Sequence, residues 1–140
     1  MNTKATLPKG CKLVSIPHVG DERGDLAFAE AQGTIPFGIQ RVFWVYDIPA
    51  EVKRGGHAHR TCSEVVVPIT GAFTMMVDDG RARAEVRMES PSEGILIPAG
   101  VWCELKDFAP GTALVVMASE RYDATGYVHD YSTYLKTLRQ

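Results

Sequence analysis

The sequence predicts an all-β fold, a sandwich or small barrel of short strands that ends with one helix. Segments rich in β-branched and aromatic residues recur at short intervals along the chain. Gly, Pro and Asp lie between these segments and are typical turn residues. Only residues 127–138 have a helix-like pattern. Closely spaced strands without intervening helices favour a sandwich or a small barrel.

The first clear strands lie in the middle of the chain. Residues 40–47 (QRVFWVYD) are rich in β-branched and aromatic side chains. Residues 64–70 (EVVVPIT) are also apolar, and Pro68 predicts an edge position or a bulge because proline cannot donate to a β-ladder. Residues 73–77 lead into the Asp-Gly dipeptide at 79–80, which is a strong hairpin signal.

The second strand of this hairpin has the clearest alternation. In residues 81–88 (RARAEVRM), apolar side chains alternate with charged ones, which is typical of a half-buried strand. Its arginines therefore belong to a solvent-facing surface, and we assign them no role in function. Residues 94–97, 101–105 and 112–118 continue the series of strands. Residues 127–138 are expected to form a helix that packs outside the β-structure.

The bulk properties exclude several classes of protein. A chain of 140 residues with 45% hydrophobic residues is expected to form one globular domain, spanning 1–140. A formal net charge of −2 argues against general nucleic-acid binding. No apolar run approaches the roughly 20 residues that cross a bilayer, and residues 1–10 lack the apolar core of a signal peptide. Three cysteines without C-x-x-C spacing predict free thiols and a cytoplasmic protein.

The most informative segment is residues 54–71, RGGHAHRTCSEVVVPITG. Side chains two apart in a strand point the same way, so His57 and His59 are expected to project side by side. Ala58 would then face the opposite layer. A pair of surface histidines at a strand end is the simplest alternative. The longer run H-x-H-x₄-E-x₆-G, which includes Glu64, makes a functional pair the better interpretation.

This run resembles the first motif of the cupin family. A second cupin-like element follows, in which Gly94 precedes PAG and then VWC. Metal-binding cupins usually carry a histidine where Cys103 stands. The resemblance implies a cupin fold, a jelly-roll β-barrel, here with a short C-terminal helix.

The sequence is also similar to the sugar 3,4-ketoisomerases, which act on dTDP-4-keto-6-deoxyglucose. The similarity extends from about residue 21 to about residue 134. It is carried by DERG, the Ile-Pro pair at 35–36, RVFWVYD, RGGHAH, VDDG, PAGVW, ELKDF and MASERYD. It implies an isomerase that needs no metal and no cofactor, and a homodimer formed by strand exchange. The sequence departs from the family pattern at two positions. Relatives often carry histidine where this sequence has Cys103, and a larger residue where it has Gly56.

The resemblance assigns catalysis to His57 and His59. Moving a ketone from C4 to C3 needs no redox chemistry, because the C4 carbonyl acidifies the hydrogen on C3 and an enediol links the two ketones. Imidazoles suit this reaction because they exchange protons near neutral pH. Either histidine can be the base. Both the galacto and the gluco product stay open, because the configuration at C4 depends on which face of the enediol is protonated.

Six further residues are candidates for substrate binding. Arg23, Arg41 and Arg54 lie in family-like segments, and a guanidinium can bind a diphosphate through two parallel hydrogen bonds. The alternative for each is a solvated surface arginine. Glu64 can fix a histidine tautomer or contact a sugar hydroxyl, or it can be a carboxylate at a strand edge.

The aromatic residues and the cysteine have two interpretations each. Trp102 can stack on the sugar or on thymine, or it can pack in the core. Cys103 can be a weak acid of the site or a small buried apolar group. Trp44 and Tyr46 share one face by parity and are expected to divide between the core and the ligand pocket.

Three other functions compete with this one. His57, His59 and Glu64 can form the facial triad of a metal-dependent, dioxygenase-like cupin. A 3,5-epimerase of the deoxyhexose pathway also removes a proton next to a ketone, but such enzymes are usually longer and lack this H-x-H arrangement. A non-catalytic sugar-binding cupin would need the arginines and aromatic residues but not the paired imidazoles.

Overall fold

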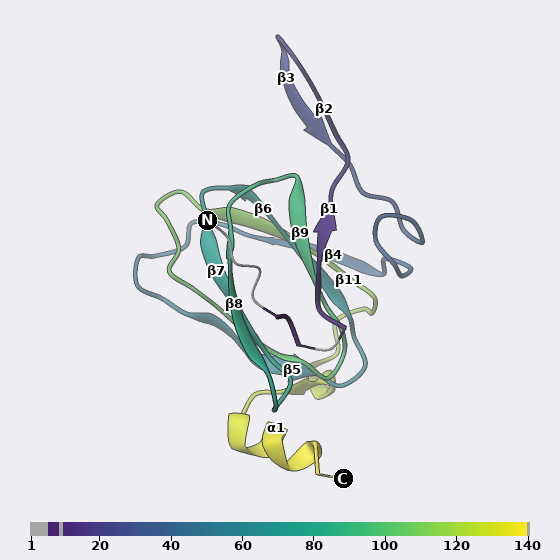
Figure 1. The fold of residues 1–140 in the computed structure, drawn as a ribbon, viewed down its shortest axis with the longest axis vertical. Coiled ribbons are helices and arrows are strands. Elements are labelled where there is room, and N and C mark those ends of the chain that lie inside the picture. Colours follow the sequence, from purple (N-terminus) through teal and green to yellow (C-terminus); the bar gives the residue numbers. More distant parts are fainter. Residues whose placement is uncertain (1–5, 9, 140) are drawn as a thin grey trace.

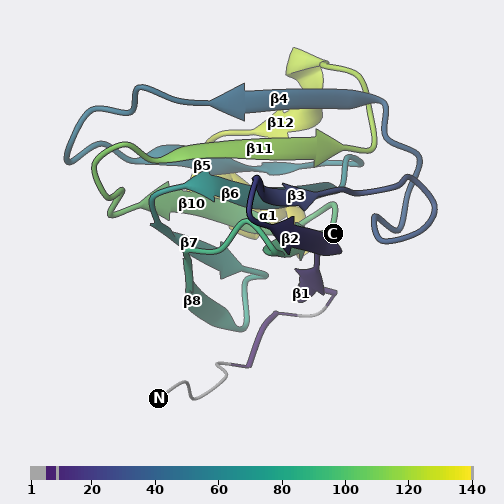
Figure 2. The same ribbon diagram turned by 90° about the horizontal axis from the view of Figure 1, so that it is seen from above.

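The all-β prediction is confirmed by a computed structural model, which describes residues 6–8 and 10–139. Two five-stranded antiparallel sheets face each other (Figures 1 and 2). The first sheet has the order β1 (Lys12–Ser15), β9 (Glu93–Ile97), β6 (Glu64–Thr70), β11 (Ala113–Ala118) and β4 (Arg41–Val45). The second has the order β12 (Tyr127–Val128), β5 (Arg54–His59), β10 (Trp102–Lys106), β7 (Phe73–Asp78) and β8 (Arg83–Met88).

The two sheets form a jelly-roll-like sandwich rather than the closed barrel that we expected. No ladder joins one sheet to the other among the described residues. The inner faces instead meet through side chains, which form the largest hydrophobic cluster of the protein. Phe73, Met75 and Leu114 are examples, and each is almost completely buried. Burying a side chain of this size contributes roughly 1.5–3 kcal/mol, so packing holds the sheets together without a continuous ladder.

Pro68 lies beside a β-ladder irregularity, one of the two positions that the sequence allowed, and not in an edge strand. Strand β6 is central in its sheet, but its ladder with β9 covers only residues 64–66. The register with β11 also shifts at Leu114, which lies opposite Pro68. Proline has no backbone N–H to donate to a ladder. Here the ladder with β9 ends before Pro68, and the ladder with β11 is irregular beside it, so the absence of this donor is tolerated.

Strand β4 faces the opposite way from our expectation. Trp44 is 65% exposed and Tyr46 is 61% exposed, so neither side chain belongs to the core or to a pocket of its own chain. Their shared face, which parity predicted, is the outer face of an edge strand. Phe43 and Val45 point inward instead and pack against the core.

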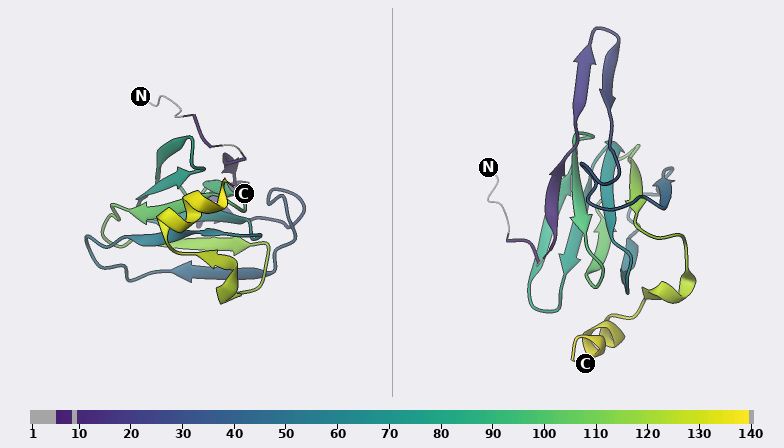
Figure 3. Two further views of the ribbon diagram at one scale, coloured as in Figure 1. Left: turned by 90° about the horizontal axis from the view of Figure 1, so that it is seen from below. Right: turned by 90° about the vertical axis from the view of Figure 1, so that its right-hand side faces the viewer.

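Strands β2 (His18–Asp21) and β3 (Gly24–Ala27) form a two-stranded hairpin that projects from the sandwich (Figures 1 and 3). All eight of its strand residues are exposed. Val19 and Leu26 are large apolar residues among them. This segment therefore pairs with itself and leaves both of its faces uncovered.

The C-terminal helix is shorter than predicted. Helix α1 spans Tyr131–Thr137, after a 3₁₀ turn at Ala124–Gly126 and strand β12. The side chain of Asp130 accepts a hydrogen bond from the backbone N–H of Thr133, which caps the helix and fixes where it begins. The preceding residues add a strand to the second sheet instead of extending the helix. No helix in the described part of the chain is long and apolar enough to cross a membrane.

Candidate active site

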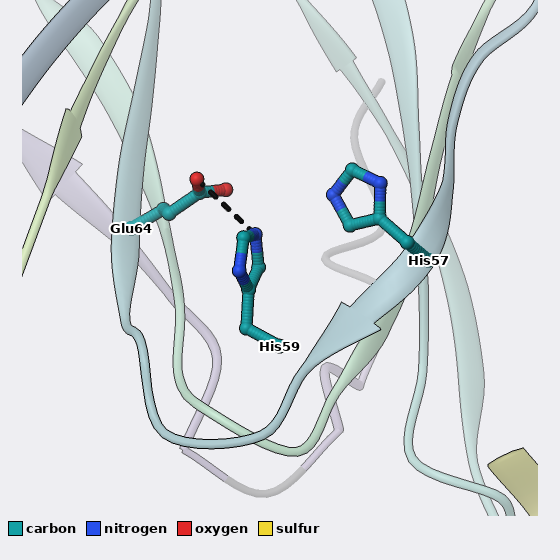
Figure 4. Close-up of side chains that lie close together, drawn as sticks. All are labelled: His57, His59 and Glu64. Atoms are coloured by element: carbon teal, nitrogen blue, oxygen red, sulfur yellow. Dashed lines mark ion pairs between the residues drawn. The ribbon is translucent and has the colours of Figure 1, made fainter. Parts of the chain in front are cut away.

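Strand β5 directs His57 and His59 toward the interior of the sandwich, as their spacing predicted (Figure 4). Ala58 lies on the other face, where it is buried in a second cluster. A register shift in the pairing of β5 with β10 precedes the histidines. Gly55 permits this irregularity, because its φ is +78° and a Cβ would lie 3.0 Å from the carbonyl oxygen of Cys103.

The histidines adjoin a cavity of about 220 Å³ between the two sheets. Its walls are mainly apolar, and its polar lining includes His57, Glu64, Arg54 and Tyr127. An apolar enclosure with a few converging polar groups is the usual form of a small-molecule site.

The two imidazoles and one carboxylate point toward one another (Figure 4). The ring centroids of His57 and His59 are 4.9 Å apart, with the rings nearly perpendicular. Nε2 of His59 is 3.2 Å from Oε2 of Glu64, and both side chains are buried. The two atoms are in contact but are not aligned as a hydrogen bond, so this nitrogen has no hydrogen-bond partner in the structure.

Burial and the neighbouring His59 lower the pKa of His57 to about 4. The carboxylate of Glu64 acts in the opposite direction but does not compensate for the loss of solvent. His57 is therefore a neutral imidazole at physiological pH, and its lone pair is free to accept a proton.

The same three residues have the composition of a metal site. Their possible ligand atoms all lie within 4.8 Å of one another. Two imidazoles and a carboxylate suit a divalent transition metal of the facial-triad type. His57, His59 and Glu64 are thus the residues that would hold such an ion.

Arg41 lies in the site and is not a solvated surface arginine. Its Nη2 is 3.9 Å from Oε2 of Glu64, and its Nη1 donates a hydrogen bond of 3.5 Å to the hydroxyl of Tyr127. Its guanidinium also lies over the rings of Phe43 and Tyr122. Arg41 is therefore held beside the histidines by a carboxylate, a phenol and two aromatic rings.

The other two candidate arginines differ in position. Arg54 is exposed at the start of β5 and lines the cavity. Arg23 lies at the turn of the projecting hairpin, where its side chain is 85% exposed and forms an ion pair with Asp21. Arg23 does not line the cavity of its own chain.

Trp102 and Cys103 point to opposite sides of β10. The indole of Trp102 packs against Tyr131 and Tyr134 of helix α1, and its Nε1 donates a hydrogen bond to Glu104. This position favours the core interpretation of Trp102 over stacking on a ligand. Cys103 lines the cavity and is buried, and burial raises the pKa of its thiol well above the ordinary range. It is a small, neutral wall residue.

Two residues of the site were not found in the sequence. The ring of Tyr127 packs against both imidazoles, and His129 lies beyond it, with its ring centroid 6.1 Å from that of His57. Both were assigned to the helix. The signal that could have found them is Asp130, a good N-cap residue that ends the preceding extended segment.

A two-sheet β fold with paired imidazoles beside a buried carboxylate defines a cupin-like protein. Residues 9–139 match the family model described as FdtA: WxcM-like, C-terminal. Over 127 residues the chain is 34% identical to a TDP-4-oxo-6-deoxy-alpha-D-glucose-3,4-oxoisomerase of Aneurinibacillus thermoaerophilus, with 91% of each chain covered. The chain belongs to this FdtA family and, like its relatives, is an isomerase.

Solved structures support the same assignment. A 3,4-ketoisomerase from Helicobacter canadensis is 30% identical, with a TM-score of 0.91 and coverage of 94% of this chain and 98% of that one. A sugar 3,4-ketoisomerase from Thermoanaerobacterium thermosaccharolyticum, solved in complex with TDP, is 28% identical, with a TM-score of 0.91 and coverage of 95% and 97%. The family that the sequence motifs indicated is therefore confirmed.

Proposed function

We propose that this protein moves the keto group of dTDP-4-keto-6-deoxyglucose from C4 to C3, in the biosynthesis of 3-amino-3,6-dideoxyhexoses. The observation that carries the proposal is the neutral His57, which lies beside His59 and lines a largely apolar cavity between the sheets. Such a pair can remove and return protons without a redox cofactor. The related structure from Thermoanaerobacterium thermosaccharolyticum that contains TDP-4-keto-6-deoxyglucose supports the choice of substrate.

In the proposed mechanism, His57 is the base because it is neutral and lines the cavity. Its lone pair takes the hydrogen on C3 as a proton, and the C3–H electrons form the C3–C4 double bond of an enediolate. The former C4 carbonyl oxygen gains a proton. The C3 hydroxyl then loses its proton and becomes the ketone, while C4 receives a proton. The sugar neither gains nor loses electrons.

His59 and Glu64 are proposed to complete the proton balance. Their contact at 3.2 Å allows the carboxylate to stabilise an imidazolium on His59 while a proton is held there. Donors close to the enediolate oxygen would lower the barrier further, by about 3–4 kcal/mol for each well-placed group. Arg54 and Arg41 are proposed to serve the diphosphate end of the substrate, and Glu64 can also contact a sugar hydroxyl.

The test is to incubate the protein with dTDP-4-keto-6-deoxyglucose in D₂O and follow the sugar by NMR. We expect deuterium to replace the hydrogen on C3 and a 3-keto sugar to accumulate, which a 3-aminotransferase can trap. The spectrum of the trapped amine also distinguishes the galacto from the gluco product. A protein that binds the nucleotide sugar without any exchange at C3 would be a binding module and would overturn the proposal.

We also propose that the protein is a cytoplasmic homodimer formed by strand exchange. The exposed apolar face of β4 and the exposed hairpin support this, because large uncovered apolar patches usually mark an interface. The hairpin would carry Arg23 to the site of the partner, where it could serve the diphosphate. Three buried free cysteines, Cys11, Cys62 and Cys103, are consistent with a reducing compartment.

A metal-dependent cupin is the second candidate, because His57, His59 and Glu64 have the geometry of a facial triad. The two functions differ in their response to chelation. We expect isomerase activity to persist after prolonged treatment with EDTA and removal of the chelator. Complete loss of activity, with rescue by one divalent metal, would make the three residues metal ligands.

A further inference from the structure

Tyr127 occupies a fixed position opposite the second histidine. In the ladder between β12 and β5, Tyr127 pairs with His59 and Val128 pairs with Ala58. Residues directly opposite in an antiparallel pair project to the same face. The phenol ring therefore enters the interior from the edge of the second sheet, on the same side as the imidazoles.

The ring of Tyr127 packs against both imidazoles. Its centroid is 4.4 Å from that of His59, with the rings tilted by 52°, and 5.1 Å from that of His57, with the rings nearly perpendicular. A histidine side chain can rotate about two bonds, and its catalytic use requires one orientation. The phenol ring removes space that either imidazole would need in order to rotate away.

The hydroxyl of Tyr127 has a separate partner. It accepts the hydrogen bond from Nη1 of Arg41, whose other terminal nitrogen lies 3.9 Å from the carboxylate of Glu64. The hydroxyl therefore helps direct the guanidinium toward the carboxylate that contacts His59.

The other side of β12 is anchored. Val128 is buried in a cluster with Ala58, Trp102 and Tyr134. The hydroxyl of Tyr134 donates a hydrogen bond of 2.7 Å to the carbonyl oxygen of Gly100. Helix α1 thus holds a strand of only two residues in place, which gives Tyr127 a rigid base.

We propose that Tyr127 is a positioning residue of this isomerase. Its ring fixes the orientation of both imidazoles, and its hydroxyl orients Arg41. This inference rests on the proposed function, but the positioning itself can be measured without substrate.

The experiment compares Tyr127→Phe, which keeps the ring, with Tyr127→Leu, which removes it. A misplacement near 1 Å can cost about a hundredfold in rate, so we expect the leucine variant to lose roughly ten- to a hundredfold in kcat with a smaller change in KM. The phenylalanine variant should keep kcat within about threefold and show a raised KM, because only Arg41 is released. Phe108→Leu is the matched control: it also removes an aromatic ring, but this ring packs against Phe73 and does not line the cavity.

Imidazole ¹H–¹⁵N NMR spectra supply the readout that needs no activity. The Tyr127→Leu variant should shift or broaden the ring signals of His57 and His59, whereas the Tyr127→Phe and Phe108→Leu variants should preserve them. If the leucine variant does not fold, Tyr127→Met removes the ring in its place. Wild-type kcat and unchanged imidazole spectra in a folded, ring-free variant would overturn the inference. If the wild-type protein does not convert the sugar, the proposed function fails while these spectra still test the positioning.

Discussion

Nε2 of His59 lies 3.2 Å from Oε2 of Glu64, and both side chains are almost fully removed from solvent. A buried carboxylate is costly unless other groups compensate its charge. Here the compensation comes from the imidazole on one side and from Arg41 at 3.9 Å on the other. The charge of Glu64 is therefore available to stabilise a proton on His59.

The first prediction concerns this charge. Glu64→Gln keeps the shape of the side chain and removes its charge, so a protonated His59 should lose its partner. We expect kcat to fall by roughly ten- to a hundredfold, the usual cost of removing a group that orients a functional histidine. Affinity for dTDP, measured by titration calorimetry, should fall by a smaller factor, because Arg41 keeps its hydrogen bond to Tyr127. Glu89→Gln, an exposed residue, is the control, and equal activity of the two variants would remove Glu64 from the mechanism.

The second prediction concerns the histidine pair. Asparagine at position 57 or 59 keeps a polar group of similar reach but cannot exchange a proton near pH 7. We expect either variant to lose about 10²–10⁴-fold in turnover while nucleotide-sugar binding survives. Turnover is measured by NMR and binding by calorimetry. Full activity in the double asparagine variant would move the chemistry elsewhere in the cavity.

The third prediction is a stability change with pH that arises from His57. Its pKa is about 4 in the folded protein, below the ordinary value near 6.5 in an unfolded chain. Between these values the unfolded state binds more protons, so acidification from pH 6.5 toward 4 destabilises the fold, by at most about 3 kcal/mol for this group. Above pH 6.5 the group has no effect.

Urea unfolding at several pH values checks this prediction. The free energy of unfolding of the wild type should fall more steeply between pH 6.5 and 4.5 than that of His57→Asn, which cannot take up the proton. Parallel pH profiles of the two proteins would show that His57 is not held neutral by the fold.

The sequence predicted the fold class and the central pair because both depend on local patterns. Alternation in strands and the i, i+2 parity of His57 and His59 are set within a few residues. Long-range features were less accessible. Parity put Trp44 and Tyr46 on one face, but whether that face points inward depends on where β4 lies in its sheet.

The dependence on long-range contacts also explains why the sequence did not reveal the positions of Tyr127 and Trp102. Tyr127 enters the site because β12 pairs with β5, a contact between segments almost 70 positions apart. A helical pattern across 127–138 hid this strand, although Asp130 marks the true start of the helix. Trp102 lies in a motif typical of the site, yet helix α1 covers it from the outside.

The fourth prediction separates two arginines. Arg54 lines the cavity and is exposed, so Arg54→Ala should weaken binding by roughly ten- to a hundredfold, the loss of a charge-assisted hydrogen bond, and leave kcat nearly unchanged. Arg41→Ala should lower both affinity and kcat, because Glu64 and Tyr127 lose a partner. Arg81→Ala is a surface control. Steady-state kinetics distinguishes the outcomes, and identical effects at 41 and 54 would contradict the distinction.

The fifth prediction concerns the uncovered face of β4. Trp44 and Val42 are exposed on an edge strand, so a charge at position 44 should weaken the proposed dimer. We expect sedimentation velocity at micromolar concentration to show a dimer for the wild type and a larger monomer fraction for Trp44→Glu. A wild-type monomer would contradict strand exchange.

Mixed dimers test whether Arg23 acts in the site of the partner. Arg23→Ala leaves a chain with an intact histidine pair, and His57→Asn leaves a chain with an intact hairpin. If the hairpin crosses over, a mixed dimer has one complete site, which combines the histidines of the first chain with Arg23 of the second. Random pairing of the two variants, co-expressed in equal amounts, should therefore restore about a quarter of the wild-type sites. If Arg23 acted within its own chain, every site in the mixture would lack one of the two residues, and the activity would not exceed the average of the separate variants.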